Sequence, residues 1–191
     1  MQLVTDPTYP RSLKGVRAQA ALRLTAGSET LAESRGELQF TETGLSGPAA
    51  FDISRAASFC GEGGVVHIDL LPDYGEDDIV QLLADKEAAL PKLGTEELLT
   101  GVIHNRLGKM LMKFAQISPS RKLGDLTETE LHAVAGACKN FEIKLHGVEG
   151  FDSAQVTAGG IKTTGVNPQT MESWFVPHLF ICASLSLFRV S

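Results

Sequence analysis

The sequence has few cysteines and no excess of positive charge, and each shortage excludes a class of protein. Aromatic residues are also few. Its 191 residues include only 3 cysteines. None of them lies in a CxxC pair, so neither a disulfide framework nor a zinc site is expected. Lys and Arg number 17 against 23 Asp and Glu, which gives a net charge of −6. This acidic balance argues against a nucleic-acid-binding protein.

Long hydrophobic runs are also missing. The most apolar stretch, residues 175–190, is interrupted by Pro177, His178 and Arg189. It is therefore a buried strand in our interpretation and not a membrane span, which needs roughly 18 consecutive apolar residues. The N-terminus has no basic region followed by an apolar one, so no signal peptide is expected. With its unpaired cysteines, the chain is predicted to be cytoplasmic and to have no membrane partner.

The remaining pattern changes twice along the chain. Residues 16–24 alternate between apolar and polar, as a half-buried strand does, and short strands are expected at 30–34, 37–41 and 65–71. A short helix is expected at 51–57 after Pro48. Helical spacing then predicts helices at 77–89, 96–104 and 106–115, the second of them capped by Thr95. A Thr127–Glu130 capping box begins a fourth. The remaining expected strands are at 141–145, 154–157, 166–173 and 175–182.

This β, α, β order predicts an α+β protein. We expect a β-barrel-like domain formed by both ends of the chain, residues 1–74 and 141–182. A small helical subdomain, residues 75–140, is inserted into it. Residues 183–191 form a divergent tail.

Catalytic motifs are absent from the residue pattern. Residues 44–48, GLSGP, lack the final glycine of a nucleophile elbow, so a turn is the better interpretation. The five histidines have no metal-ligand spacing, and no metal is expected. Asp69 and Asp73 flank the end of the strand predicted at 65–71, where acidic side chains form caps and turn hydrogen bonds. Residues 154–161, AQVTAGGI, are open to two interpretations: a tight turn or bulge, or the close approach of backbone to a flat ligand.

Three motifs in order resemble one known family. Residues 36–48, GELQFTETGLSGP, resemble a GELLFTxxGLSGP signature, and residues 154–161 resemble AxVTxGGV. Residues 167–173, NPQTMES, followed by VPHLFI at 176–181, resemble P-x-TMES-x-x-VPGLYFAGE. The ordered set is similar to the HI0933/YhiN-like NAD(P)/FAD-dependent oxidoreductases, which include BaiN-like and aminoacetone-oxidase-like proteins.

The resemblance implies a location and a cofactor. In that family this region is a barrel-like substrate domain with a helical insertion, and FAD is the cofactor. Thr157, Gly159 and Gly160 would lie near the flavin in the parent enzyme. A segment lining the substrate pocket would contain four further residues: Thr41, Gly44, Ser46 and Gly47. The catalytic residues are not identified by these motifs.

The sequence also departs from the family. It contains no strand–GxGxxG–helix unit to bind the FAD pyrophosphate. After residue 182, the Gly-Glu and the acidic, glycine-rich segment of the family are absent. We therefore expect a truncated flavoprotein: a substrate domain that binds no FAD and is inactive alone. The parent enzyme would act on a small-molecule substrate.

Two further expectations follow. A free-standing, non-catalytic binding module is the alternative function, because a complete barrel core would permit it. The predicted strand at 175–181 would expose an apolar edge, so a homo-oligomer through that strand is expected.

Overall fold

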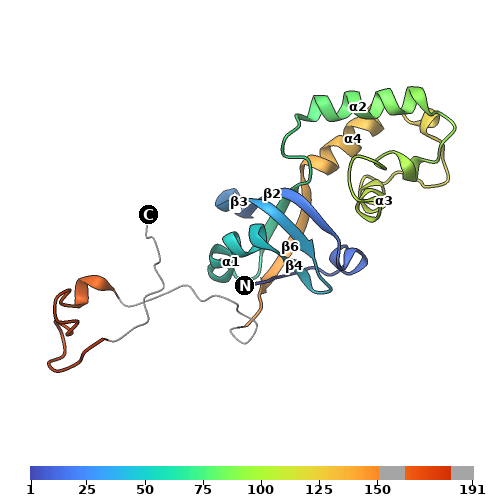
Figure 1. Cartoon of the computed structure of the whole chain (residues 1–191). Coiled ribbons are helices and arrows are strands. Elements are labelled where there is room, and N and C mark those ends of the chain that lie inside the picture. Colours follow the sequence, from blue (N-terminus) through green and yellow to red (C-terminus); the bar gives the residue numbers. More distant parts are fainter. Residues whose placement is uncertain (151–161, 182–191) are drawn as a thin grey trace. The chain divides into compact units, whose positions relative to one another are not determined.

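The computed structural model describes residues 1–150 and 162–181 (Figure 1). The chain divides into two compact units, Met1–Val156 and Thr157–Ser191. The expected strand at 154–157 lies outside the described residues.

Six antiparallel strands close into a barrel in the first unit. In chain order they are β1 (Leu3–Thr5), β2 (Arg17–Ala26), β3 (Glu29–Phe40), β4 (Gly44–Ser46), β5 (Gly64–Asp69) and β6 (Phe141–Val148). The order around the barrel is β1-β4-β3-β2-β5-β6. Because β6 pairs with both β1 and β5, the strand that follows the helices closes the sheet. Together with the helices, this confirms the predicted α+β class with a barrel.

A long hairpin joins β2 to β3 through a turn at Gly27, whose φ is +59°. The sequence predicted two short strands here, separated near Gly36. The structure has one strand of 12 residues instead. Gly36 pairs with Ala20 inside the ladder, and a Cβ at Gly36 would lie 3.8 Å from the backbone nitrogen of Ala49. The glycine therefore marks close packing of a helix against the strand and not a break in the strand.

That helix is α1 (Pro48–Cys60), and it packs against β2 and β3. Proline at its first position and Gly61 after its end, with a φ of +63°, set its limits. It is longer than the helix expected at 51–57. Its buried side chains join those of the barrel strands in one core; the largest include Phe40, Phe141, Leu3, Leu22, Leu24, Leu38, Leu45, Ile53 and Ile68. Each fully buried leucine stabilises the fold by about 1.5–3 kcal/mol.

The helices between β5 and β6 are α2 (Glu76–Ala89), α3 (Asn105–Phe114) and α4 (Glu128–Lys139). The predicted capping box at the start of α4 is confirmed. Thr127 Oγ1 accepts a hydrogen bond from Glu130 N at 3.3 Å, and Thr127 N donates to Glu130 Oε2 at 2.8 Å. Figure 1 shows α2 and α4 side by side.

The prediction of a helix at 96–104 is wrong. Only a 3₁₀ turn, η2 (Thr95–Glu97), is helical there, and Gly101 has a φ of +88°. Thr95 does not cap the turn with its side chain. Its buried hydroxyl donates to Ser118 O at 2.7 Å, which ties this loop to the one after α3.

The second unit also differs from expectation. Its described part is irregular apart from η5 (Thr163–Gly165) and two isolated bridges, Val166–Ser173 and Glu172–Phe180. The prediction of strands at 166–173 and 175–182 is therefore wrong for the part that the structure describes, residues 166–181. Local hydrogen bonds replace ladder bonds: Asn167 Oδ1 accepts from Gln169 N at 2.9 Å.

Within the described residues, no helix is both long and apolar enough to cross a membrane. The domain limits at residues 74, 140 and 182 stay predictions.

Candidate functional site

The predicted substrate-pocket residues lie in one short segment, from the turn after β3 (Thr41) through β4 (Gly44 and Ser46) to the residue before α1 (Gly47). Thr41 Oγ1 accepts hydrogen bonds from Gln2 Nε2 at 2.8 Å and from Gly44 N at 3.1 Å. Ser46 pairs with Gln39 in the barrel ladder. The bond from Gln2 ties the turn after β3 to the residue that precedes β1.

Both glycines of this segment, Gly44 and Gly47, are explained by nearby backbone. A Cβ at Gly44 would lie 2.1 Å from Leu3 O, so any side chain would push β4 away from β1. Gly47 has a φ of +95°, and a Cβ there would lie 2.7 Å from Glu37 O. The glycines of this motif thus serve barrel closure and the start of α1. Their predicted role in a substrate pocket stays a prediction.

The predicted flavin-proximal residues, Thr157, Gly159 and Gly160, lie outside the described residues. No catalytic residue was expected from the sequence.

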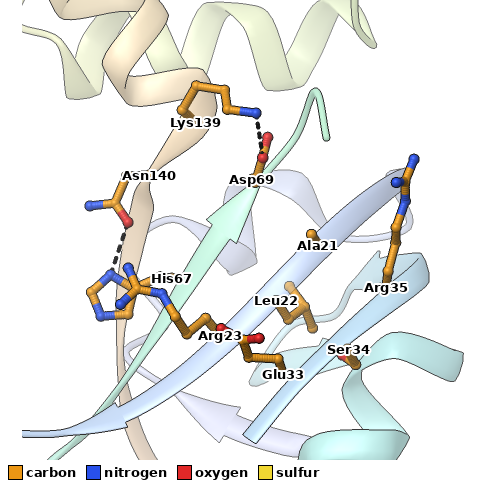
Figure 2. A pocket seen from close by; sticks show the side chains of 10 residues that line it. All are labelled: Ala21, Leu22, Arg23, Glu33, Ser34, Arg35, His67, Asp69, Lys139 and Asn140. Carbon is orange, nitrogen blue, oxygen red and sulfur yellow. Dashed lines mark hydrogen bonds and ion pairs between the residues drawn. The ribbon is translucent and has the colours of Figure 1, made fainter. Parts of the chain in front are cut away.

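A polar depression of the first unit lies elsewhere, on the outer wall of the barrel (Figure 2). We call it the barrel-wall pocket. Its volume is about 480 Å³. Strands β2, β3 and β5 and the end of α4 line it: Ala21, Leu22, Arg23, Glu33, Ser34, Arg35, His67, Asp69, Lys139 and Asn140. None of the four predicted substrate-pocket residues lines it.

Strand register builds this pocket. Arg23 on β2 lies opposite Glu33 on β3 and His67 on β5. Two positions along, Ala21 lies between Arg35 and Asp69. Because side chains alternate along a strand, both rows face the same side of the barrel wall. The alternation predicted at 16–24 puts Arg23 on the polar side of its strand, and strand register then brings it beside Glu33 and His67.

His67 is the most enclosed titratable group in the first row, with a side chain only 16% exposed. Its Nδ1 lies 2.9 Å from Asn140 Oδ1, and its Nε2 lies 3.0 Å from Thr25 Oγ1. An amide oxygen accepts only, so Nδ1 carries the proton in this arrangement. Asn140 Nδ2 in turn donates to Glu142 Oε1 at 2.7 Å. The ring is therefore held in one orientation at the edge of the pocket.

The second row ends in an ion pair. Lys139 Nζ lies 2.5 Å from Asp69 Oδ2 and also donates to Tyr74 O at 2.7 Å. Asp69 Oδ1 accepts from Leu71 N at 2.9 Å, which confirms the turn hydrogen bond expected for an acid after this strand. Figure 2 shows Lys139 reaching from the end of α4 to Asp69 on β5. The pair joins the helices to the barrel.

The neighbouring thiol is unreactive. Burial, and then the negative charge of Asp69, raise the pKa of Cys138 to about 12. A thiol of that pKa holds its proton at neutral pH and is no nucleophile. The barrel-wall pocket itself is lined by charged and polar side chains and by no cysteine.

The second unit holds an apolar depression of about 580 Å³. Phe175, Leu179, Phe180 and Ile181 are among its lining residues. The TMES motif shapes it: Glu172 Oε1 accepts from His178 N at 2.8 Å, and Ser173 Oγ accepts from Phe175 N at 3.1 Å.

Neither depression fits an FAD molecule. The barrel-wall pocket is lined mainly by charged and polar side chains, and the depression of the second unit has no α-helix N-terminus to receive a pyrophosphate, only the single 3₁₀ turn η5. Where the described glycines exclude a Cβ most strongly, at Gly44 and Gly47, the space is taken by the chain's own backbone. The described residues thus form no flavin cradle.

Comparison with known proteins gives this fold its class. Residues 2–156 match the model of the HI0933-like protein barrel and H2TH domain, and the chain belongs to this family. The barrel and its helices are the part that matches.

Particular relatives are known. A 3-dehydro-bile acid delta(4,6)-reductase of Clostridium scindens is 30% identical over 174 residues, which are 90% of this chain and 42% of the relative. A ribosomal RNA dihydrouridine synthase of Escherichia coli is 34% identical over 146 residues, 76% of this chain and 35% of the relative. Its namesake in Haemophilus influenzae is 28% identical over 145 residues, 75% and 34% of the two chains. This chain thus spans less than half the length of these relatives.

Proposed function

We propose that this chain is the substrate domain of a flavin-dependent oxidoreductase that reduces its substrate. The family match over residues 2–156 carries the proposal. The names of the relatives support the direction of the reaction, because one is a reductase and the other makes a dihydro product. FAD would supply the electron transfer, and the protein would bind and orient the substrate.

A small-molecule substrate is the part of the proposal supported by the bile acid reductase. We assign Thr41, Gly44, Ser46 and Gly47 to the substrate side of the site, as the family motif implies. Thr157, Gly159 and Gly160 would approach the flavin ring, where glycine allows close contact. A cytoplasmic location accords with the free thiols of Cys60 and Cys138.

The chain alone should hold no FAD, because its sequence has no GxGxxG unit to bind a pyrophosphate. Titration of the purified chain with FAD, followed by gel filtration, tests this. We expect flavin absorbance to elute separately from the protein. A stoichiometric yellow complex would show that the chain is self-sufficient.

A chimera tests the substrate-domain role itself. The aligned segment of the C. scindens reductase would be replaced by residues 2–156 of this chain, with the unmodified reductase as control. We expect the chimera to retain flavin and to be reduced by the same electron donor. It should lose turnover of the bile acid if substrate choice resides in this domain. A folded chimera that keeps full bile acid turnover would contradict that role.

The alternative is a free-standing binding module without catalysis. DNA sequence on both sides of the reading frame separates the two. A GxGxxG segment before it and a Gly-Glu segment after it would support the oxidoreductase, and their absence would support the module.

A further inference from the structure

Acidic and basic side chains are separated among the helices of the first unit. Helix α2 carries five acidic residues: Glu76, Asp77, Asp78, Asp85 and Glu87. Helix α3 carries none, and its charged residues are Arg106, Lys109 and Lys113. These three are exposed, while Leu107, Met110 and Leu111 are buried. The net charge of −6 therefore does not describe the surface of α3.

A second basic segment, the 3₁₀ helix η1 (Pro10–Leu13), is fastened alongside α3. The Arg106 guanidinium donates to Lys14 O at 3.2 Å and also to Ser12 O. At the other end of α3, the rings of Phe114 and Tyr9 pack edge to face with centroids 5.7 Å apart. Two contacts at opposite ends of α3 thus fix the orientation of this segment.

The result is one surface, which we call the basic face; its members are Arg11, Lys14, Arg106, Lys109 and Lys113. All five are exposed. On α3 the spacing of three and four residues places the three cations in one row about 10 Å long.

Only part of this charge is neutralised. Lys14 pairs with Glu42 at 2.7 Å, and Lys109 pairs with Glu96 at 3.1 Å. All four side chains are about half exposed or more, so these pairs are weak and easily exchanged for another anion. Arg11 and Lys113 form no side-chain hydrogen bond or ion pair with any residue that the structure describes. Of the five cations, two are thus in exposed ion pairs, and Arg106 donates to backbone carbonyls that carry no net charge.

We propose that the basic face binds the phosphate backbone of RNA. Phosphates are the groups that a row of exposed Lys and Arg attracts, through Coulomb attraction and counterion release. A membrane surface is less suited, because the large exposed apolar side chains of the described residues include none on α3 or η1. Two relatives that match over three quarters of this chain are named for action on ribosomal RNA.

This inference goes beyond the proposed function and differs from the expectation, drawn from net charge, that the chain binds no nucleic acid. It does not require FAD, since the surface belongs to the described barrel and helices. Failure of RNA binding and failure of the oxidoreductase role are therefore measured separately.

The test uses the purified chain and a fluorescent RNA hairpin, with anisotropy measured over a range of KCl concentrations. The test variant is Arg11→Gln/Lys113→Gln. The matched control is Arg55→Gln/Lys144→Gln, which removes two exposed cations from α1 and β6 and so has the same net charge. We expect the test pair to weaken binding more than roughly tenfold at low salt and to lower the log–log salt slope by about 2. The control pair should change neither value.

Two further measurements decide the partner. A decaglutamate peptide is expected to compete only weakly with the hairpin, because it lacks phosphates. Circular dichroism and urea unfolding should give the same stability for both double variants. Equal loss of binding in both pairs, or no binding by the parent chain, would overturn the proposal. Competition by the peptide as strong as by unlabelled RNA would also overturn it, in favour of an acidic protein partner.

Discussion

Lys139, the last residue of α4, forms an ion pair with Asp69 at the end of β5, with 2.5 Å between Nζ and Oδ2. The two residues are 70 positions apart in the sequence. Each side chain is 22% exposed, so the pair is largely shielded from water. The inserted helices are thereby joined to the barrel at the point where the chain leaves β5 and returns to β6.

Replacement of Lys139 by methionine should loosen this junction. The substitution leaves Asp69 without its cation and removes the bonds to Leu71 O and Tyr74 O. We expect a loss of about 1–3 kcal/mol in the free energy of unfolding, measured with urea. Lys144→Met, at an exposed position of β6, is the control and should cost much less. Equal losses would mean that the pair has no special role.

Gly44→Ala tests the explanation of the GLSGP motif. The new Cβ would lie 2.1 Å from Leu3 O and would separate β4 from β1. We expect a loss of about 3 kcal/mol or more, or failure to fold. Gly150→Ala is the control, because a Cβ there has no heavy atom within 4 Å. A Gly44→Ala protein as stable as the parent would refute barrel closure as the reason for this glycine.

Stability at low pH should depend on Glu130. Its hydrogen bonds from Arg121 first, and from the backbone of Thr127 next, lower the pKa of Glu130 to about 2, against an ordinary value of 4.5. The unfolded chain thus takes up a proton at a higher pH than the folded one does. The contribution of Glu130 is complete above about pH 5 and is lost as the pH falls toward about 2.

Glu130→Gln should flatten the fall in stability over that range, measured by urea unfolding at several pH values. The control is Glu128→Gln on the same helix, because Glu128 forms no side-chain bond with a described residue. Its stability should fall with pH as steeply as that of the parent chain. An unchanged slope in Glu130→Gln would contradict the assignment.

Self-association is expected to depend on the second unit. Phe175 is 82% exposed, and Trp174 and Phe180 are more than half exposed. Apolar surface of this kind favours contact with another chain, although not through the strand edge predicted from sequence. Phe175→Ser should reduce association in sedimentation velocity. Phe59→Ser on α1 is the matched control, because Phe59 is 81% exposed. If both variants associate like the parent, this surface is not the contact.

Local signals predicted the elements whose stability is local. Alternation in β2 and the Thr127 capping box were correct because each depends on neighbours within a few residues. The glycine in β3 was misinterpreted, since only the packing of α1 explains it. Thr95 was misinterpreted for a similar reason: its hydroxyl bonds to Ser118, which lies 23 residues away.

The sequence by itself determined the α+β class, the barrel interrupted by helices, and the family. Hydrophobic periodicity and the order of motifs can be recognised in the sequence alone. Only the tertiary structure decided which charged side chains lie together on the surface. Strand register places Arg23 between Glu33 and His67. A contact across 92 residues brings Arg106 to Lys14. Net charge is a sum over the whole chain, whereas binding depends on where the charges lie, and only folding sets their positions.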